Sequence, residues 1–124
     1  MNKPSSSVLP HAPVFSWHRS HGGLIFTSGH AAIDVDTYRR ARVTFGDEVR
    51  LTLDNLGRTL EQAGSSLDKV LKVTVYLVDM KRYPDFNRIY GGYFPSETPP
   101  ARTCVEVQRL PFDFQVEIEA IAAE

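Results

Sequence analysis

Near its C-terminal end the chain reads RTCVEVQR at residues 102–109 and FQVEIEAIA at residues 114–122. Both stretches alternate with period two, which is typical of β-strands with two different faces. Arg102 and Cys104 share one face of the first, and Glu117 lies on the polar face of the second. If the two strands pair as a hairpin around Pro111–Phe112, Arg102 lies opposite about residue 121, several residues from Glu117 along the sheet.

A helix is predicted upstream of these strands. Apolar residues recur at steps of four and three, which places them on one helical face: Val49, Leu53, Leu56, Leu60 and Ala63. Thr44 with Asp47 is a possible N-terminal cap, and Gly64 suits the end of the helix.

Further elements surround that helix. Residues 22–30 read as a strand that ends in a sharp turn at Gly29, and residues 31–45 as a short strand or loop. Residues 70–78 read as a strand with one apolar face made of Leu71, Val73, Val75 and Leu77. A short second helix begins near Pro84. The order strand–strand–helix–strand–helix–strand–strand predicts an α+β fold with both helices on one face of the sheet.

Size and charge restrict the class of protein. The chain has 124 residues and a net charge of −1, which suits one domain over residues 1–124 with a flexible lead-in at 1–12. The balanced charge disfavours nucleic acid as a partner, and no apolar run approaches a membrane span. A single cysteine and the lack of a signal-peptide pattern indicate a cytoplasmic protein.

Arg102 and Glu117 are the polar residues best suited to chemistry. A guanidinium binds a planar carboxylate through two parallel hydrogen bonds, and a carboxylate can orient or deprotonate water. The alternative is that both belong to a solvated strand face with ordinary ion pairs, and spacing alone leaves both open. Cys104 has no histidine close in sequence, so we expect buried packing and not a nucleophile.

The four histidines do not form a metal motif. They are His11, His18, His21 and His30. His18-x-x-His21 has the spacing of two metal ligands on a helix, but two glycines follow directly. No Cys or carboxylate lies at ligand spacing from these histidines. We therefore expect four surface histidines and no metal.

The tail PARTCVEVQRLPFDFQVEIEAIA (100–122) closely resembles the signature of the reactive intermediate imine deaminases, the Rid/YjgF family, formerly also called the endoribonuclease L-PSP family. Three more stretches resemble the family in the right order: LIFTSGH (24–30), the long segment 53–80 and DFNRIYGGYF (85–94). About 110 of the 124 residues are covered.

The resemblance implies a chorismate-mutase-like fold that assembles as a homotrimer with active sites between subunits. It also implies hydrolysis of 2-imino acids, or their 2-enamino tautomers, to 2-keto acids and ammonia without a cofactor. Arg102 stands where the family's arginine holds the substrate carboxylate, and Glu117 where its glutamate places the attacking water. The remaining matches are pocket positions: Ser28, Gly29, Asn87 and Cys104.

This sequence departs from the family beside the pocket. Phe15, a further expected substrate-binding residue, stands where the best-studied branch has a tyrosine, and His30 replaces the usual glutamine. Trp17 and His18 also replace smaller or polar residues. Because of these changes, the resemblance does not say which side chain the substrate carries. The alternative function is a non-catalytic trimer that binds a small carboxylate and regulates another process. Ribonuclease activity is disfavoured by the balanced charge.

Overall fold

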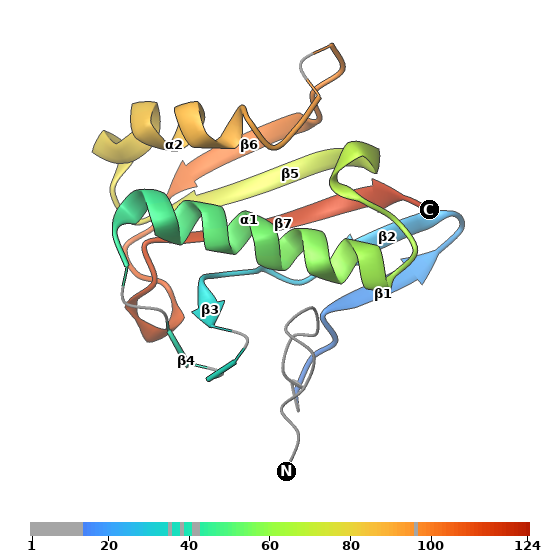
Figure 1. Ribbon diagram of the computed structural model, residues 1–124, viewed down its shortest axis with the longest axis horizontal. Helices are drawn as coiled ribbons and strands as arrows, with labels where there is room; N and C mark the ends of the chain where they lie inside the picture. The colour runs from blue at the N-terminus through green and yellow to red at the C-terminus, as the bar shows by residue number, and fades with distance from the viewer. Residues whose placement is uncertain (1–13, 35, 38, 41–42, 96) are drawn as a thin grey trace.

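A computed structural model describes residues 14–124 except 35, 38, 41–42 and 96. Five strands form a mixed sheet in the order β1-β2-β7-β5-β6, and two short strands form a second sheet. Their bounds are β1 His18–His21, β2 Leu24–Thr27, β3 Ile33–Asp34, β4 Arg39–Arg40, β5 Val70–Leu77, β6 Ala101–Glu106 and β7 Val116–Ala123. Helices α1 (Phe45–Gln62) and α2 (Tyr83–Tyr90) cover the same face of the large sheet (Figure 1). The predicted α+β fold is confirmed.

Helix α1 forms where the local signals agree. The Thr44 hydroxyl accepts the Asp47 N–H at 3.2 Å, and beyond the helix Gly64 adopts a φ of +86°. This is the left-handed conformation that glycine adopts most readily. The spaced apolar residues of α1 are buried against the sheet: Val49, Leu53, Leu56 and Leu60. Among the described helices, none is long and apolar enough to cross a membrane.

Strand β5 lies in the middle of the core and has one irregularity. Val73, Val75 and Leu77 are buried beneath the helices as expected. Leu71 was expected on the same face but is 52% exposed, and Val70 is buried in its place. The pairing with β7 shifts register between Val70 and Lys72, so the alternation is interrupted there.

Strands β6 and β7 are not neighbours, so the hairpin considered for them is wrong. Strand β5 lies between the two, parallel to β6 and antiparallel to β7. Helix α2 supplies the crossover that a parallel β5–β6 pair requires. Arg102 therefore pairs with Val73, and Glu117 pairs with Tyr76.

The N-terminal region contains a hairpin that the sequence pattern did not resolve. Strand β1 pairs with β2 through a two-residue turn, Gly22–Gly23, with φ values of +59° and +82°. Two positive φ angles match the turn that a tight hairpin favours. The segment read as one strand over residues 22–30 is thus β2 plus an extended connection, and the strand or loop predicted at 31–45 contains β3 and β4. The lead-in expected at residues 1–12 lies outside the described residues.

Candidate functional site

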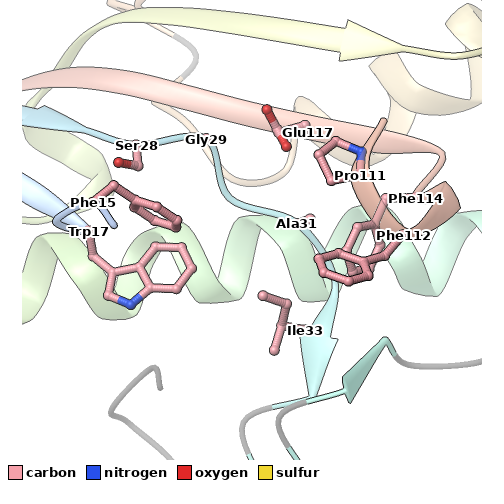
Figure 2. A pocket seen from close by; sticks show the side chains of 10 residues that line it. All are labelled: Phe15, Trp17, Ser28, Gly29, Ala31, Ile33, Pro111, Phe112, Phe114 and Glu117. Carbon is pink, nitrogen blue, oxygen red and sulfur yellow. The ribbon is translucent and has the colours of Figure 1, made fainter. Parts of the chain in front are cut away.

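A pocket of about 300 Å³ opens beside Glu117 on β7 (Figure 2). Four of the predicted site residues meet there: Phe15, Ser28, Gly29 and Glu117. The rest of the wall is apolar and consists of Trp17, Ala31, Ile33, Pro111, Phe112 and Phe114. We call this the Glu117 pocket.

Gly29 brings the backbone directly against the Glu117 side chain. His30 and Ile118 exchange two backbone hydrogen bonds of 2.7 and 2.9 Å, which align the segment after β2 with β7. A Cβ on residue 29 would lie 2.5 Å from Oε2 of Glu117 and 2.9 Å from its Cγ. A side chain at this position would displace the carboxylate, so the close approach explains the glycine.

The Glu117 carboxyl has an environment suited to proton transfer. Burial, and then the negative charge of Glu119, raise its pKa above the ordinary glutamate value. No cation in the described part of the chain forms an ion pair with it. A carboxylate with a raised pKa accepts and returns a proton closer to neutral pH than an exposed one does.

Arg102 lies in a second cluster, between β6 and α2. Its Nη2 donates to the hydroxyl of Tyr83 at 2.8 Å, and its guanidinium carbon lies 4.8 Å from the ring centre of Tyr90 and 5.8 Å from that of Phe86. Among the described residues no carboxylate lies within ion-pair distance of Arg102. The aromatic rings thus hold the guanidinium and leave some of its N–H donors for the carboxylate of a ligand.

Asn87 and Cys104 belong to the same cluster. Asn87 shares the face of α2 with Tyr83 and Tyr90, and its buried Oδ1 has no hydrogen-bond partner among the described residues; the same is true of the Tyr90 hydroxyl. Burial raises the pKa of Tyr90 to about 12, so this hydroxyl keeps its proton. Burial also raises the pKa of the Cys104 thiol, which disfavours a nucleophilic thiolate. We call these residues, with Arg102 and Phe86, the Arg102 cluster.

The two groups lie on opposite faces of the sheet. Arg102 pairs with Val73, which is buried on the helix-covered face, and cross-strand partners point to the same side. Glu117 pairs with Tyr76, which alternates with the buried Val75 and so lies on the far face. The expectation that Arg102 and Glu117 lie apart along one surface is therefore wrong. One chain places Phe15, Ser28 and Gly29 with Glu117, and Asn87 and Cys104 with Arg102.

His30 is not the surface residue that the sequence suggested. It is 1% exposed, with Nδ1 2.8 Å from the Ser28 carbonyl and Nε2 2.7 Å from the Thr59 hydroxyl. The carbonyl can only accept, so Nδ1 carries the proton and Nε2 accepts from Thr59. Burial lowers the pKa of His30 to about 4. Of the other histidines, His21 is exposed and His18 is half-buried, while His11 lies outside the described residues.

Two features in and near the pocket were not found from the sequence. Phe112 and Phe114 form one aromatic side of it, although the Pro-Phe stretch had suggested only a turn. Glu48 of α1 is buried and accepts backbone N–H groups of Gln115 at 2.6 Å and Val116 at 3.3 Å. A glutamate in the first turns of a helix is usually a surface residue, so no local signal pointed to this contact.

Within the described ranges, no three His, Cys, Asp or Glu side chains are grouped to hold a metal ion.

Comparison with known proteins identifies the family. Residues 9–124 match the protein family described as Endoribonuclease L-PSP. A solved structure of YyfA from Yersinia pestis, a protein of unknown function of the conserved Rid family, is 30% identical, covers 98% of this chain and 97% of its own, and has a TM-score of 0.91. The chain belongs to the Rid/YjgF family.

Other Rid/YjgF relatives carry varied names. A RutC family protein from Pyrococcus horikoshii is 46% identical over 101 residues, 82% of this chain and 79% of its own. Protein HMF1 from Saccharomyces cerevisiae is 37% identical over 121 residues, 94% of this chain and 92% of its own. A structure of E. coli TdcF with bound serine has a TM-score of 0.86, is 29% identical, and covers 98% of this chain and 96% of its own. Family membership is therefore firm, while these names leave the reaction open.

Proposed function

We propose that this Rid/YjgF protein hydrolyses 2-imino acids, or their 2-enamino tautomers, to 2-keto acids and ammonia. Each active site would combine the Glu117 pocket of one chain with the Arg102 cluster of another. The observation that carries the proposal is the division of two complementary groups, a carboxylate-free arginine and a carboxyl of raised pKa, between opposite faces of the sheet.

In this scheme Arg102 binds the substrate carboxylate. Tyr83 and the aromatic rings of α2 fix the guanidinium, so its remaining N–H groups are oriented before the substrate arrives. The structure of TdcF with bound serine supports a ligand of this kind, because serine carries the same α-carboxylate that a 2-imino acid carries.

Glu117 acts as general base and general acid. As a water oxygen attacks the imine carbon, Glu117 takes a proton from that water and returns it to the substrate nitrogen. Glu117 then takes the hydroxyl proton of the tetrahedral intermediate and delivers it to the amine nitrogen, so that the C–N bond breaks with its electron pair on nitrogen and ammonia and the 2-keto acid leave. The imine carbon is already electrophilic, so orientation and water placement are the main tasks of the protein. No cofactor enters these steps.

Assembly follows from the uncovered sheet face, and we propose the homotrimer that the family resemblance implies. Within the described part of the chain, neither α1 nor α2 lies over the face that carries Glu117 (Figure 1). Phe26 on β2 is 41% exposed there and Val105 on β6 is 39% exposed. Exposed apolar side chains on a sheet face favour association with another subunit.

The test is imine hydrolysis. 2-Iminopropanoate and 2-iminobutanoate would be generated in situ with an amino-acid oxidase or dehydratase, and the remaining imine trapped with semicarbazide. We expect the wild type to accelerate loss of imine, and Arg102→Ala to lower kcat/KM by about 100-fold because the charged anchor is lost. Arg88→Ala is the matched control, since Arg88 is an exposed arginine of α2 paired with Asp85.

The outcome separates this reaction from its alternatives. No acceleration with any imine, together with keto-acid binding in calorimetry, would favour the non-catalytic carboxylate-binding protein. The family description includes the word endoribonuclease, but the charge of this chain disfavours ribonuclease activity. A net charge of −1 offers no broad positive field to bind the phosphate backbone of RNA.

A further inference from the structure

The Glu117 pocket has an unusually aromatic wall. Figure 2 shows Phe15 and Trp17 on one side of it and Phe112 and Phe114 on the other, with Glu117 on β7 between them. The remaining lining residues are apolar except for Ser28, whose hydroxyl already donates to the Ser16 carbonyl at 2.6 Å. Glu117 is therefore the polar side chain that the pocket offers to a ligand.

Neighbouring contacts hold the Phe15 and Trp17 side in place. The two rings meet edge to face, with centres 5.1 Å apart. Trp17 also packs on His30, with ring centres 5.0 Å apart, and His30 is fixed by Ser28 and Thr59. The indole thus rests on a buried ring that has a single hydrogen-bonded orientation, so this side of the pocket is preorganised.

The opposite side depends on a strained turn, η3 (Pro111–Asp113). Phe112 and Asp113 have φ values of +59° and +60°, a conformation that side-chain-bearing residues adopt rarely and at a cost in energy. An exposed ion pair of 3.0 Å between Arg109 and Asp113 spans the turn. The turn leaves Phe112 81% exposed at the edge of the pocket. A strained backbone that holds a large apolar ring at a pocket rim is typical of a ligand-binding feature.

We propose that this pocket selects 2-imino acids with aromatic or bulky apolar side chains over those with small or charged ones. The inference rests on the proposed deaminase function and names its substrate class. A volume of about 300 Å³ is at the lower end for small-molecule sites and suits one ligand the size of an amino acid. The substrate side chain lies between the two aromatic pairs, with its imine carbon at Glu117 and its carboxylate at Arg102 of a second copy. A charged side chain loses its hydration between the aromatic rings, where no polar group lies because Glu117 is at the imine carbon, so it is disfavoured.

The experiment compares imines made in situ by an L-amino-acid oxidase from alanine, leucine and phenylalanine. We expect kcat/KM for the phenylalanine-derived imine to exceed that for the alanine-derived one by about tenfold or more, because apolar contacts discriminate on this scale. Phe112→Ser should reduce that ratio severalfold. Leu71→Ser is the matched control, since Leu71 is 52% exposed and lies outside the pocket lining, and it should leave the ratio unchanged.

Calorimetry with stable products makes the result independent of turnover. Phenylpyruvate should bind the wild type more tightly than pyruvate, and Phe112→Ser should narrow the difference. Faster or equal hydrolysis of the alanine-derived imine would overturn the substrate class while leaving the deaminase function intact. If no imine is hydrolysed, the deaminase function fails. In that case the calorimetry alone tests the pocket preference. Equal binding of phenylpyruvate and pyruvate, or binding of neither, would overturn it.

Discussion

Glu117 and the residues that touch it determine how the site behaves at the scale of single side chains. The backbone of Gly29 lies against the carboxylate, Glu119 is a neighbouring negative charge, and burial removes water from part of the group. The first contact restricts where the carboxylate can point, and the other two determine when it carries a proton. Position and protonation can therefore be changed separately by substitution.

Gly29→Ala should impair catalysis more than folding. The new methyl group would lie 2.5 Å from Oε2 of Glu117, so the carboxylate must swing away from the place where it meets water. We expect kcat to fall by about 100-fold, the scale on which misplaced catalytic groups act. Gly57→Ala is the control, because its nearest neighbour, a Leu67 methyl, is 3.4 Å away and α1 tolerates alanine. Equal activity in the two variants would contradict the role given to Gly29.

The pH profile should report the raised pKa of Glu117. A general base must be deprotonated, so activity falls as pH drops through that pKa, and a raised pKa puts this acid limb above the range of an ordinary glutamate. Glu119→Gln removes a negative charge that raises the pKa, so the limb should move to lower pH. Glu61→Gln, on an exposed position of α1, should not move it. A limb that stays in place in Glu119→Gln would exclude Glu117 as the titrating base.

His30 should make stability depend on pH. Its pKa is 6.5 unfolded and about 4 folded, so the unfolded chain binds a proton between these values and the folded chain does not. Stability is full above pH 6.5 and falls by up to about 3 kcal/mol as pH drops toward 4. Urea unfolding at pH 7 and pH 4.5 measures this loss. His30→Gln should flatten the dependence, whereas His21→Gln, at an exposed position, should leave it unchanged.

At the scale of elements, Glu48 connects α1 to the start of β7. Its carboxylate accepts two backbone N–H groups, from Gln115 and Val116, and the Gln115 side-chain amide at 3.1 Å. These bonds fix the strand directly after the Pro111–Asp113 turn, and so they also fix one aromatic side of the pocket.

Glu48→Ala should loosen that connection. It leaves buried N–H groups without an acceptor and should lower the free energy of unfolding by about 3 kcal/mol. Glu48→Gln keeps one acceptor oxygen and should lower the free energy of unfolding by less. Denaturant titrations of both variants measure the difference. An alanine variant as stable as the wild type would show that these hydrogen bonds contribute little.

Elements with local signals were predictable, and elements that depend on distant partners were not. Helix α1 has a cap, a periodic apolar face and a terminal glycine that agree, so its bounds follow from the sequence. The hairpin of residues 102–109 and 114–122 is wrong because β5, some 30 residues upstream of β6, inserts between them. Leu71 is exposed because a register shift interrupts an otherwise regular alternation.

The sequence indicated residues in both parts of the candidate site, but it missed the Phe112 and Phe114 wall and the arrangement of the two parts. Arg102 and Glu117 stand out as polar strand residues and match the family's arginine and glutamate, yet alternation alone does not say which face of a strand meets the helices. That depends on the strand order, a non-local property. The positive φ of Phe112 had no sequence signal either, since Phe rarely adopts that conformation.

At the scale of the whole molecule, the separation of Arg102 from Glu117 is the decisive feature. The sheet lies between them, so no substrate can touch both in one chain. The proposed homotrimer would solve this problem, because each interface of a cyclic trimer joins one face of a subunit to a different face of the next. Activity should therefore belong to pairs of subunits and not to single chains.

The most direct measurement is complementation between two inactive variants. Arg102→Ala and Glu117→Gln chains would be co-expressed with different tags, and the mixed oligomers purified through both tags. Each variant alone should be inactive. In each mixed trimer one of the three sites receives an intact Arg102 from one chain and an intact Glu117 from another, so the purified mixture should recover about a third of wild-type imine hydrolysis. Mixed oligomers as inactive as the separate variants would contradict an active site shared between subunits.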